Sequence, residues 1–244
     1  MRSALKATRL ILAVASLTAM ATGLARGQTV LDRERGFCAN QDGHMSPDTQ
    51  IIACTHVIQT SNQEADRIAS AYNNRGNVYR DQGSFDLAIS DYDQAIRLSP
   101  NYANAYNNRG LAYRAQHDYV RALADFDAAI RIDPAVAGVF LNRAGAHAEQ
   151  RHFELAIGDY NQAIQLDPHF ARAFNNRGNA YRAQGNFDQA IADYTAAIAI
   201  DPNYANAYNN RGIAYRAKGD AALAAADFAQ AQQLGAADRA SQSR

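Results

Sequence analysis

The segment AYNNRGNVYR at residues 71–80 returns almost letter for letter at residues 105–114, 173–182 and 207–216. A weaker copy occupies residues 139–148. The copies start every 34 residues, with no insertion or deletion between them. A fixed period in this range is typical of one supersecondary unit that is repeated and stacked.

Each repeat is predicted to form two helices joined by a turn. In the first helix of the first repeat, Tyr72, Gly76 and Tyr79 fall at positions i, i+4 and i+7, which puts them on one helical face. The second helix has the same spacing in Ala88, Tyr92 and Ala95. Its apolar stripe is wide enough to be buried on two sides.

Glycine and proline mark the boundaries of these helices. Gly83 lies between the two helices of the first repeat, where the turn is expected. Pro100 ends the second helix, because proline disfavours helical backbone in the residue before it. The same stop recurs at Pro134, Pro168 and Pro202.

This order of aromatic, small residue, aromatic, alanine and proline resembles the tetratricopeptide repeat family. The first repeat carries the pattern as Tyr72, Gly76, Tyr79, Ala88, Tyr92, Ala95 and Pro100. The resemblance implies an all-α fold, a right-handed α-solenoid of helix-turn-helix repeats of 34 residues, with five repeats over residues 69–235. It also implies a binding scaffold, as most members of the family are, without naming a partner.

Residues 1–25 are predicted to be a secretory signal peptide. Arg2, Lys6 and Arg9 precede an apolar run from residue 10 to residue 21, and small residues follow. A membrane anchor is the alternative, but an apolar core of about a dozen residues is shorter than the roughly 20 that span a bilayer. We therefore expect a periplasmic or secreted protein that contacts a membrane only through an uncleaved signal, if at all.

The charge balance gives no indication of a nucleic-acid partner. The whole chain has 24 basic and 24 acidic residues, and loss of the three basic residues of the signal leaves a net charge near −3. Length alone predicts one or two domains. The unbroken repeat instead predicts one soluble α-helical array.

Residues 28–68 are predicted to be an N-terminal cap that contains both cysteines of the chain, Cys38 and Cys54. In an exported chain two cysteines indicate one disulfide. Free thiols in a cytosolic protein and an intermolecular bridge are the alternatives. Residues 48–58 align with residues 86–96, so we expect a half-repeat helix in which Cys54 takes the place of the packed Tyr92. End units of solenoids need such a cap, because one of their faces has no neighbour.

The fifth repeat is predicted to be a terminal unit with a more polar outer face. It has Ala221 where the other repeats have phenylalanine or tyrosine, and Gln232 where they have isoleucine. We expect its last helix to stop at Gly235 and residues 236–244 to form a disordered tail.

An arginine precedes the small packing residue of every repeat, where the family usually has leucine. In the first repeat this is Arg75, and Asp91 lies opposite it in a hairpin folded at Gly83. Five semi-buried ion pairs are therefore predicted: Arg75–Asp91, Arg109–Asp125, Arg143–Asp159, Arg177–Asp193 and Arg211–Asp227. Alternatively, Asp91 reaches Arg109 of the next repeat. Such pairs specify register more than they add net stability, because desolvation offsets most of the Coulomb gain.

A polar stripe on the first helices is the predicted binding surface. Asn73, Asn77 and Arg80 lie roughly 100° from the aromatic stripe, and the resemblance implies that this face lines a concave groove. The full set of predicted groove residues is Asn73, Asn77, Arg80, Asn107, Arg114, Leu141, Asn175, Asn179, Arg182, Asn209 and Arg216. Amides pair with the backbone of an extended peptide and guanidinium groups pair with carboxylates, so we expect an extended, acidic polypeptide segment or C-terminal tail as partner. Ordinary solvated side chains are the alternative.

A second asparagine follows the first in every repeat, at Asn74, Asn108, Asn142, Asn176 and Asn210. A structural bond to the adjacent repeat is the favoured interpretation of this row. Some family members grip a terminal carboxylate with lysine and arginine in the groove. This chain lacks most of those lysines, and Arg172 is the nearest substitute, so such a clamp is in doubt.

The third repeat departs from the pattern. Leu141, Gly145 and Ala148 replace the polar stripe, Ala144 replaces the packing glycine, and His147 replaces the second aromatic. Drift in a tolerant middle repeat is the favoured interpretation, and a notch for one hydrophobic side chain of a ligand is the alternative. His147 is predicted to be a core histidine with a local partner.

No catalytic constellation is found in the sequence. The six histidines show no metal-ligand spacing, and neither a glycine-rich phosphate loop nor a G-x-S-x-G motif is present. We expect no enzyme activity, cofactor, metal or small-molecule substrate. The leading function is an exported scaffold for a protein or peptide partner, and the alternative is a structural subunit of a cell-envelope assembly with an incidental groove.

Overall fold

The computed structural model describes residues 30–40, 43–60 and 65–242, and within these ranges the regular elements are all α-helices. The predicted class, an all-α stack of helical repeats, is confirmed. The handedness of the solenoid stays a prediction. The signal peptide predicted at residues 1–25 lies outside the described residues. In the part that is described, none of the helices has the length and apolar character needed to cross a bilayer.

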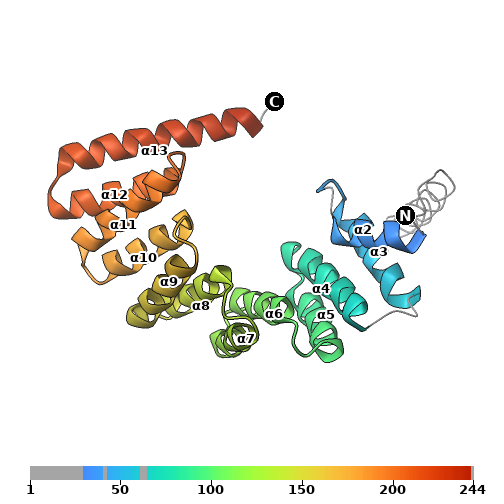
Figure 1. Cartoon of the computed structure of the whole chain (residues 1–244). Helices are drawn as coiled ribbons and strands as arrows, with labels where there is room; N and C mark the ends of the chain where they lie inside the picture. The colour runs from blue at the N-terminus through green and yellow to red at the C-terminus, as the bar shows by residue number, and fades with distance from the viewer. Residues whose placement is uncertain (1–29, 41–42, 61–64, 243–244) are drawn as a thin grey trace. The chain divides into compact units, whose positions relative to one another are not determined.

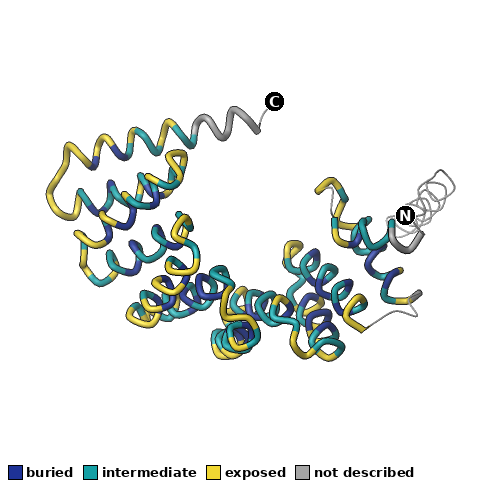
Figure 2. Tube along the Cα trace, in the orientation of Figure 1, coloured by how far each residue is buried: buried dark blue, intermediate teal, exposed yellow. Residues whose placement is uncertain are grey.

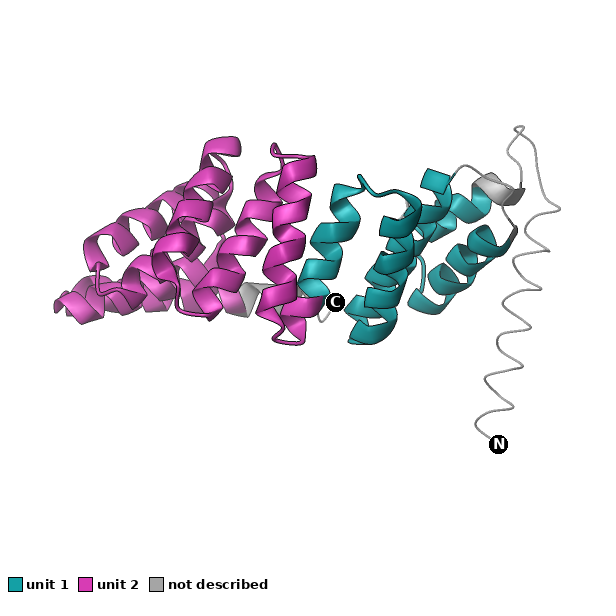
Figure 3. Ribbon diagram, turned by 90° about the horizontal axis from the view of Figure 1, so that it is seen from below, with its two compact units in different colours: residues 1–112 teal, residues 113–244 magenta. Residues whose placement is uncertain are grey.

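The chain divides into two compact units, residues 1–112 and 113–244 (Figure 3). The boundary falls inside one helix, α6 (Ala103–Ala115), and not at a linker. The sequence predicts one continuous array. The division has a physical reason, because a repeat contacts only its neighbours and a stack of repeats therefore has no single shared core.

The first unit contains the N-terminal cap and the first complete repeat (Figure 1). The cap consists of α2 (Val30–Ala39) and α3 (Pro47–Thr60), and the repeat consists of α4 (Ala65–Asp81) and α5 (Phe85–Leu98). Helix α3 covers the segment in which a half-repeat helix is predicted.

The second unit contains α7 and three complete repeats (Figure 1). Its helices are α7 (Tyr119–Ile132), α8 (Ala137–Glu149), α9 (Phe153–Leu166), α10 (Ala171–Ala183), α11 (Phe187–Ile200), α12 (Ala205–Lys218) and α13 (Ala221–Gln242). Helices α8, α10 and α12 are the first helices of the third, fourth and fifth repeats, and each packs against the helix that follows it.

The two helices of a repeat approach closely at the packing glycine. A Cβ atom added to Gly76 would lie 2.8 Å from the ring of Tyr92, and one added to Gly178 would lie 2.7 Å from the ring of Tyr194. Both tyrosines are fully buried. The burial pattern in Figure 2 follows from this packing, because one stripe of each helix is buried while the opposite side is exposed.

The turn between the helices of a repeat uses left-handed backbone. Gly83 has a φ of 74° and Gly185 a φ of 81°, values that glycine adopts without strain. The equivalent residues of the second and third repeats are His117, with a φ of 61°, and Arg151, with a φ of 63°. These two residues place a Cβ in a conformation that costs an L-residue roughly 1–2 kcal/mol.

The cap is joined to the first repeat through the cysteines. Cys38 and Cys54 form a disulfide whose Cα atoms lie 4.6 Å apart. Both cysteines pack in a buried cluster with Val57 of α3 and Ala71 of α4. The disulfide therefore links α2 to α3, and these two helices pack against α4 of the first repeat.

The C-terminal helix is longer than the sequence predicts. Helix α13 continues through Gly235 to Gln242, so the predicted stop at Gly235 and the predicted disordered tail from residue 236 are wrong for residues 236–242. Leu234 precedes this glycine and Ala236 and Ala237 follow it, and alanine and leucine are good helix formers. One glycine costs only about 1 kcal/mol relative to alanine, which does not end the helix.

Candidate functional site

In the first, third, fourth and fifth repeats, the arginine before the packing residue pairs with the aspartate of its own repeat. Nε of Arg75 donates to Oδ2 of Asp91 over 2.8 Å, and Nη2 donates to Oδ1 over 2.7 Å. The same two-bond geometry joins Arg143 to Asp159, Arg177 to Asp193 and Arg211 to Asp227. Arg109 and Asp125 belong to different units, and their pair stays a prediction.

The third nitrogen of each guanidinium group binds the preceding repeat. Nη1 of Arg75 donates to the Thr55 hydroxyl over 2.8 Å. The equivalent bonds run from Arg109 to Asp93, from Arg143 to Asp127, from Arg177 to Asn161 and from Arg211 to Thr195. Arg75, Arg143, Arg177 and Arg211 therefore each join the second helix of their own repeat to the helix that precedes the repeat. The suggested alternative contact between Asp91 and Arg109 is made instead by Asp93, two residues further along the chain.

These ion pairs have the electrostatics of structural groups. The Asp91 residue is 5% exposed and Asp159 is 7% exposed. The hydrogen bonds that Arg75 donates to Asp91 raise the pKa of Arg75, although burial opposes the rise. Asp159 raises the pKa of Arg143 in the same way. The charges are thus held between helices, and their role in setting the register of the repeats stays a prediction.

The asparagines of the first row do not all line an open surface. Asn73 is 5% exposed and Asn175 is 4% exposed. Oδ1 of Asn73 accepts a hydrogen bond from Nδ2 of Asn108, and Oδ1 of Asn175 accepts one from Nδ2 of Asn210, both over 3.0 Å. The groove assignment of Asn73 and Asn175 is therefore wrong, because the second asparagine of the next repeat covers each of them. Of the remaining two, Asn107 is half-buried and Asn209 is exposed.

Two further predicted groove residues bind tyrosines of the core. Oδ1 of Asn77 accepts a hydrogen bond from the Tyr92 hydroxyl over 2.8 Å, and Oδ1 of Asn179 accepts one from the Tyr194 hydroxyl over 2.9 Å. Burial raises the pKa of both tyrosines above the usual value. Each hydroxyl is therefore protonated at neutral pH and acts as a donor.

The predicted row of arginines is only partly available to a ligand. Arg80 pairs with Asp81, and Arg114 makes two hydrogen bonds to Glu149, of 3.0 and 2.6 Å. Nε of Arg182 donates to the Tyr194 hydroxyl over 3.3 Å. Arg216 is exposed, with its guanidinium group 5.5 Å from the centre of the Phe228 ring. Among the residues that the structure describes, Arg182 and Arg216 are thus the members of the row without a carboxylate partner.

A pocket of about 320 Å³ opens in the second unit, where the third repeat departs from the sequence pattern. Its lining consists of Arg114, Gly145, Ala148, Glu149, Phe153, Tyr160, Asn176, Asn179 and Ala180. A Cβ atom on Gly145 would lie 2.9 Å from Nη1 of Arg114, so the glycine leaves room for the guanidinium group. The substitutions at residues 145 and 148 therefore coincide with a real hollow.

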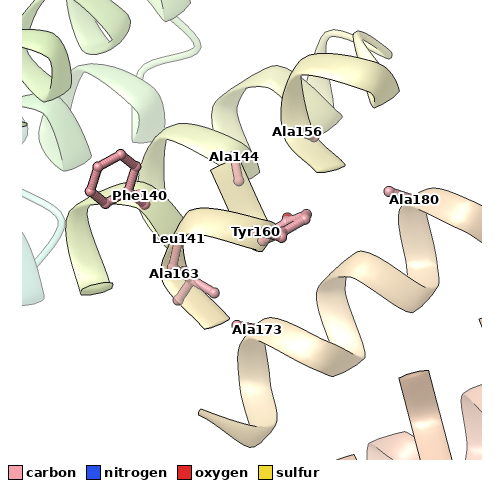
Figure 4. Close-up of a cluster of buried hydrophobic side chains, with 8 residues drawn as sticks. All are labelled: Phe140, Leu141, Ala144, Ala156, Tyr160, Ala163, Ala173 and Ala180. Atoms are coloured by element: carbon pink, nitrogen blue, oxygen red, sulfur yellow. The ribbon is translucent and has the colours of Figure 1, made fainter. Parts of the chain in front are cut away.

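The third repeat corrects two further expectations. Leu141 was predicted to line the groove, but it is 5% exposed and packs in the buried cluster of Figure 4 with Phe140 and Ala144. Leucine replaces an asparagine there, and the hydrophobic effect favours its burial. His147 was predicted to have a local partner, but its Nδ1 is buried without a hydrogen bond among the described residues. Burial lowers the pKa of this histidine.

Sequence reasoning missed Tyr160, Phe153 and Glu149 as parts of the pocket. A sequence signal could have identified Tyr160. Repeats with a tyrosine at this position of the second helix, Tyr92 and Tyr194, have an asparagine at a fixed position of the first helix, whereas the repeat of Tyr160 has Gly145 there. In the residues that the structure covers, no group of three histidine, cysteine, aspartate or glutamate side chains is placed to hold a metal ion.

Comparison with protein-family models identifies the repeats. The model described as "TPR repeat" matches residues 76–116, 152–181 and 178–219. Two models described as "Tetratricopeptide repeat" match residues 103–135 and 205–236. Together these matches cover more than half of the chain.

Solved structures share the fold. The protein in "Crystal structure of MamA" is 26% identical in sequence to this chain, with a TM-score of 0.61, and the match covers 67% of this chain and 96% of that chain. "Crystal structure of YrrB: a TPR protein with an unusual peptide-binding site" is 24% identical, with a TM-score of 0.58, and covers 75% and 92%. "Functional Characterization of Pseudomonas Aeruginosa pilF" is 20% identical, with a TM-score of 0.66, and covers 70% and 78%. The last two likenesses are of fold alone. No curated protein matches the chain.

Proposed function

Because the chain belongs to the tetratricopeptide repeat family, we propose that it is an exported scaffold that binds an extended polypeptide segment. Tetratricopeptide repeats generally mediate protein or peptide binding. The proposed surface is the face of the second unit formed by α8, α10 and α12, which is called the first-helix face below. The observation that carries the proposal is the pocket between α8, α9 and α10.

The charges on the first-helix face favour an acidic partner. Arg182 and Arg216 occupy the same position of the first helix in successive repeats, and the guanidinium fork suits a carboxylate. Arg114, in contrast, already binds Glu149. We therefore assign recognition of acidic side chains to Arg182 and Arg216.

Export is proposed from two features. The N-terminal residues have the charge and apolar pattern of a signal peptide. The Cys38–Cys54 disulfide fits a protein that folds in an oxidising compartment, because disulfides persist there and are rare in the cytosol. The periplasm or the extracellular space is therefore the proposed location.

One observation favours the second candidate function, a structural subunit of a cell-envelope assembly. In the second unit, Leu155 and Leu223 occupy the same position of the second helix in the third and fifth repeats, and both are more than half exposed. Exposed apolar side chains that recur on one side of a stack suit a protein contact. In this alternative the second helices bind neighbouring subunits and the first-helix face is incidental.

A display experiment separates the two candidates. The purified chain is immobilised and exposed to a library of random 12-residue peptides, and the retained peptides are sequenced. The scaffold proposal predicts retained peptides rich in aspartate and glutamate, and it predicts that Arg182→Glu with Arg216→Glu abolishes their retention while helicity by circular dichroism is unchanged. The matched control is Leu155→Glu with Leu223→Glu, which leaves retention intact. Retention that survives the arginine reversal but is lost in the leucine variant contradicts the scaffold and supports the second candidate.

A further inference from the structure

A tyrosine hydroxyl in the core of a repeat occurs together with an asparagine acceptor on the first helix. The Tyr92 hydroxyl donates to Asn77 and the Tyr194 hydroxyl donates to Asn179. In the second and fifth repeats the acceptor position holds an apolar side chain and the ring is a phenylalanine, as in the pairs Leu111 with Phe126 and Ile213 with Phe228. In these four repeats the core ring is a tyrosine only where an asparagine on the first helix accepts a hydrogen bond from its hydroxyl group.

The third repeat breaks this rule. It keeps the hydroxyl, in Tyr160, but the acceptor position is Gly145. Tyr160 is 2% exposed, and the structure gives its hydroxyl no hydrogen-bond partner among the described residues. The same tyrosine lines the pocket of about 320 Å³.

A second donor loses its acceptor at the same place. Nδ2 of Asn108 donates to Asn73 of the preceding repeat, and Nδ2 of Asn210 donates to Asn175. The equivalent donor of the fourth repeat is Asn176, and the position that should accept its bond is Leu141, an apolar core residue. Within the described part of the chain, Asn176 accepts a bond from Asn175 at Oδ1 and its Nδ2 makes none. Asn176 also lines the pocket.

The rest of the pocket lining sets the charge and shape of what can enter. Phe153, Ala148 and Ala180 supply apolar surface. Arg114 and Glu149 bind each other across the rim, so the lining has no net charge. An ionised carboxylate in the pocket would face Glu149 and would compete with it for the guanidinium group, which is unfavourable between like charges. A neutral group that accepts two hydrogen bonds meets no such opposition.

We propose that this pocket is a specificity site for a side-chain carboxamide, that of a glutamine or asparagine, in the bound polypeptide. The carbonyl oxygen has two lone pairs and accepts from the Tyr160 hydroxyl and from Nδ2 of Asn176. The amide nitrogen donates to the Glu149 carboxylate. The methylene groups of the side chain pack against Ala148 and Phe153. This inference rests on the proposed function, and it adds a neutral anchoring residue to a segment that is otherwise acidic.

The test uses three capped amino acids with the same backbone, the N-acetyl, N-methylamide derivatives of glutamine, glutamate and leucine. The full chain is labelled with ¹⁵N, and the side-chain amide signal of Asn176 is followed by NMR during titration. The glutamine derivative is expected to shift this signal at a concentration at least about threefold lower than the other two, which is the effect of about one net hydrogen bond. Equal responses to the glutamine and leucine derivatives, or none to any of the three, overturn the proposal.

Two variants keep the test falsifiable. Gly145→Asn returns the third repeat to the pattern of the first and fourth, supplies an acceptor to Tyr160 and fills the pocket, so it is expected to weaken glutamine binding about tenfold or more. The added side chain displaces only the flexible end of Arg114. The matched control is Gly158→Asn, the same change at an exposed position of α9 with open space around it, and it leaves binding unchanged. Unaltered binding in Gly145→Asn also overturns the proposal.

Tyr160→Phe separates a binding role from a structural one. If the hydroxyl serves a ligand, this variant loses the preference for glutamine over leucine and keeps its thermal stability. Loss of stability with the preference intact shows that the hydroxyl is structural and contradicts the proposal. Peptides retained by the display experiment without any carboxamide at a fixed position also contradict it and leave the scaffold standing. Glutamine binding without peptide retention overturns the scaffold instead.

Discussion

Arg143 and Asp159 form a two-bond ion pair between α8 and α9, and the third nitrogen of the same guanidinium group binds Asp127 of α7. One side chain thus joins three helices of the second unit. The hydrogen bonds that Arg143 donates to Asp159 hold the pKa of Arg143 above its usual value, although burial opposes the rise. Arg75, Arg177 and Arg211 make the same kind of junction in their repeats.

Removing one member of such a pair should be costly. In Arg177→Met the Asp193 carboxylate stays nearly buried without its partner, and buried pairs broken in this way lose about 3–5 kcal/mol. The arginine side chain is 19% exposed, so we expect a loss near the lower end, about 3 kcal/mol. Urea unfolding followed by circular dichroism measures it. The double variant Arg177→Met with Asp193→Leu should recover most of the stability, and a double variant as unstable as the single one would contradict the ion-pair account.

The turn of the third repeat can be relieved of strain. Arg151 holds a φ of 63°, and the equivalent Gly185 holds a φ of 81°. Arg151→Gly should therefore raise the free energy of unfolding by about 1 kcal/mol, since the left-handed conformation costs an L-residue roughly that much. The control is Gly185→Arg, for which we expect a loss of about 1–2 kcal/mol. Thermal unfolding of the two variants checks the sign, and a lower melting temperature for Arg151→Gly would refute the assignment of strain.

The cap should depend on its disulfide. Reduction, or Cys38→Ser with Cys54→Ser, removes a link across a loop of about 15 residues, which the chain-entropy model values at about 3 kcal/mol. Because the cysteines pack against Ala71, we expect amide hydrogen exchange to rise first in α2, α3 and the start of α4. Exchange measured by mass spectrometry with and without reductant tests this. Equal protection of the cap in both states would show that the disulfide does not hold it.

High pH should weaken the fold through Tyr160. Burial raises the pKa of Tyr160 to about 12, from an unfolded value of about 10. The unfolded state therefore loses this proton first, and stability is lost as the pH rises from about 10 to about 12. In Tyr160→Phe the fall should be smaller than in the unmodified chain. The measurement is the free energy of unfolding at several pH values in this window, and identical slopes for the two chains would contradict the burial of an ionisable hydroxyl.

The architecture of the repeats could be predicted from the sequence because it depends on local spacing. The period of 34 residues, the glycine that meets Tyr92 and the arginine opposite Asp91 all follow from positions along two short helices. The same spacing aligned α3 with a second helix. The alignment places Thr55 of α3 at the position of Asp93. In the structure Thr55 accepts a hydrogen bond from Arg75, as Asp93 accepts one from Arg109.

The site could be predicted less well, because it depends on contacts between repeats. Helical spacing placed Asn73 and Asn175 at the edge of an open stripe, but it does not show that Asn108 and Asn210 reach back to cover them. Nor does it show that Arg114 crosses to Glu149, 35 residues further on. The helix stop at Gly235 failed for a different reason, since a single glycine among alanines is a weak signal.

The central claim is that a polypeptide binds the first-helix face of the second unit at the pocket beside Gly145. A crystal structure of the chain with a peptide retained from the display library tests this most directly. The account predicts an extended peptide across α8, α10 and α12, with a carboxamide oxygen within hydrogen-bond distance of Tyr160 and Asn176 and a carboxylate beside Arg182 or Arg216. A peptide bound along the exposed leucines of the second helices, with the pocket empty, would contradict it.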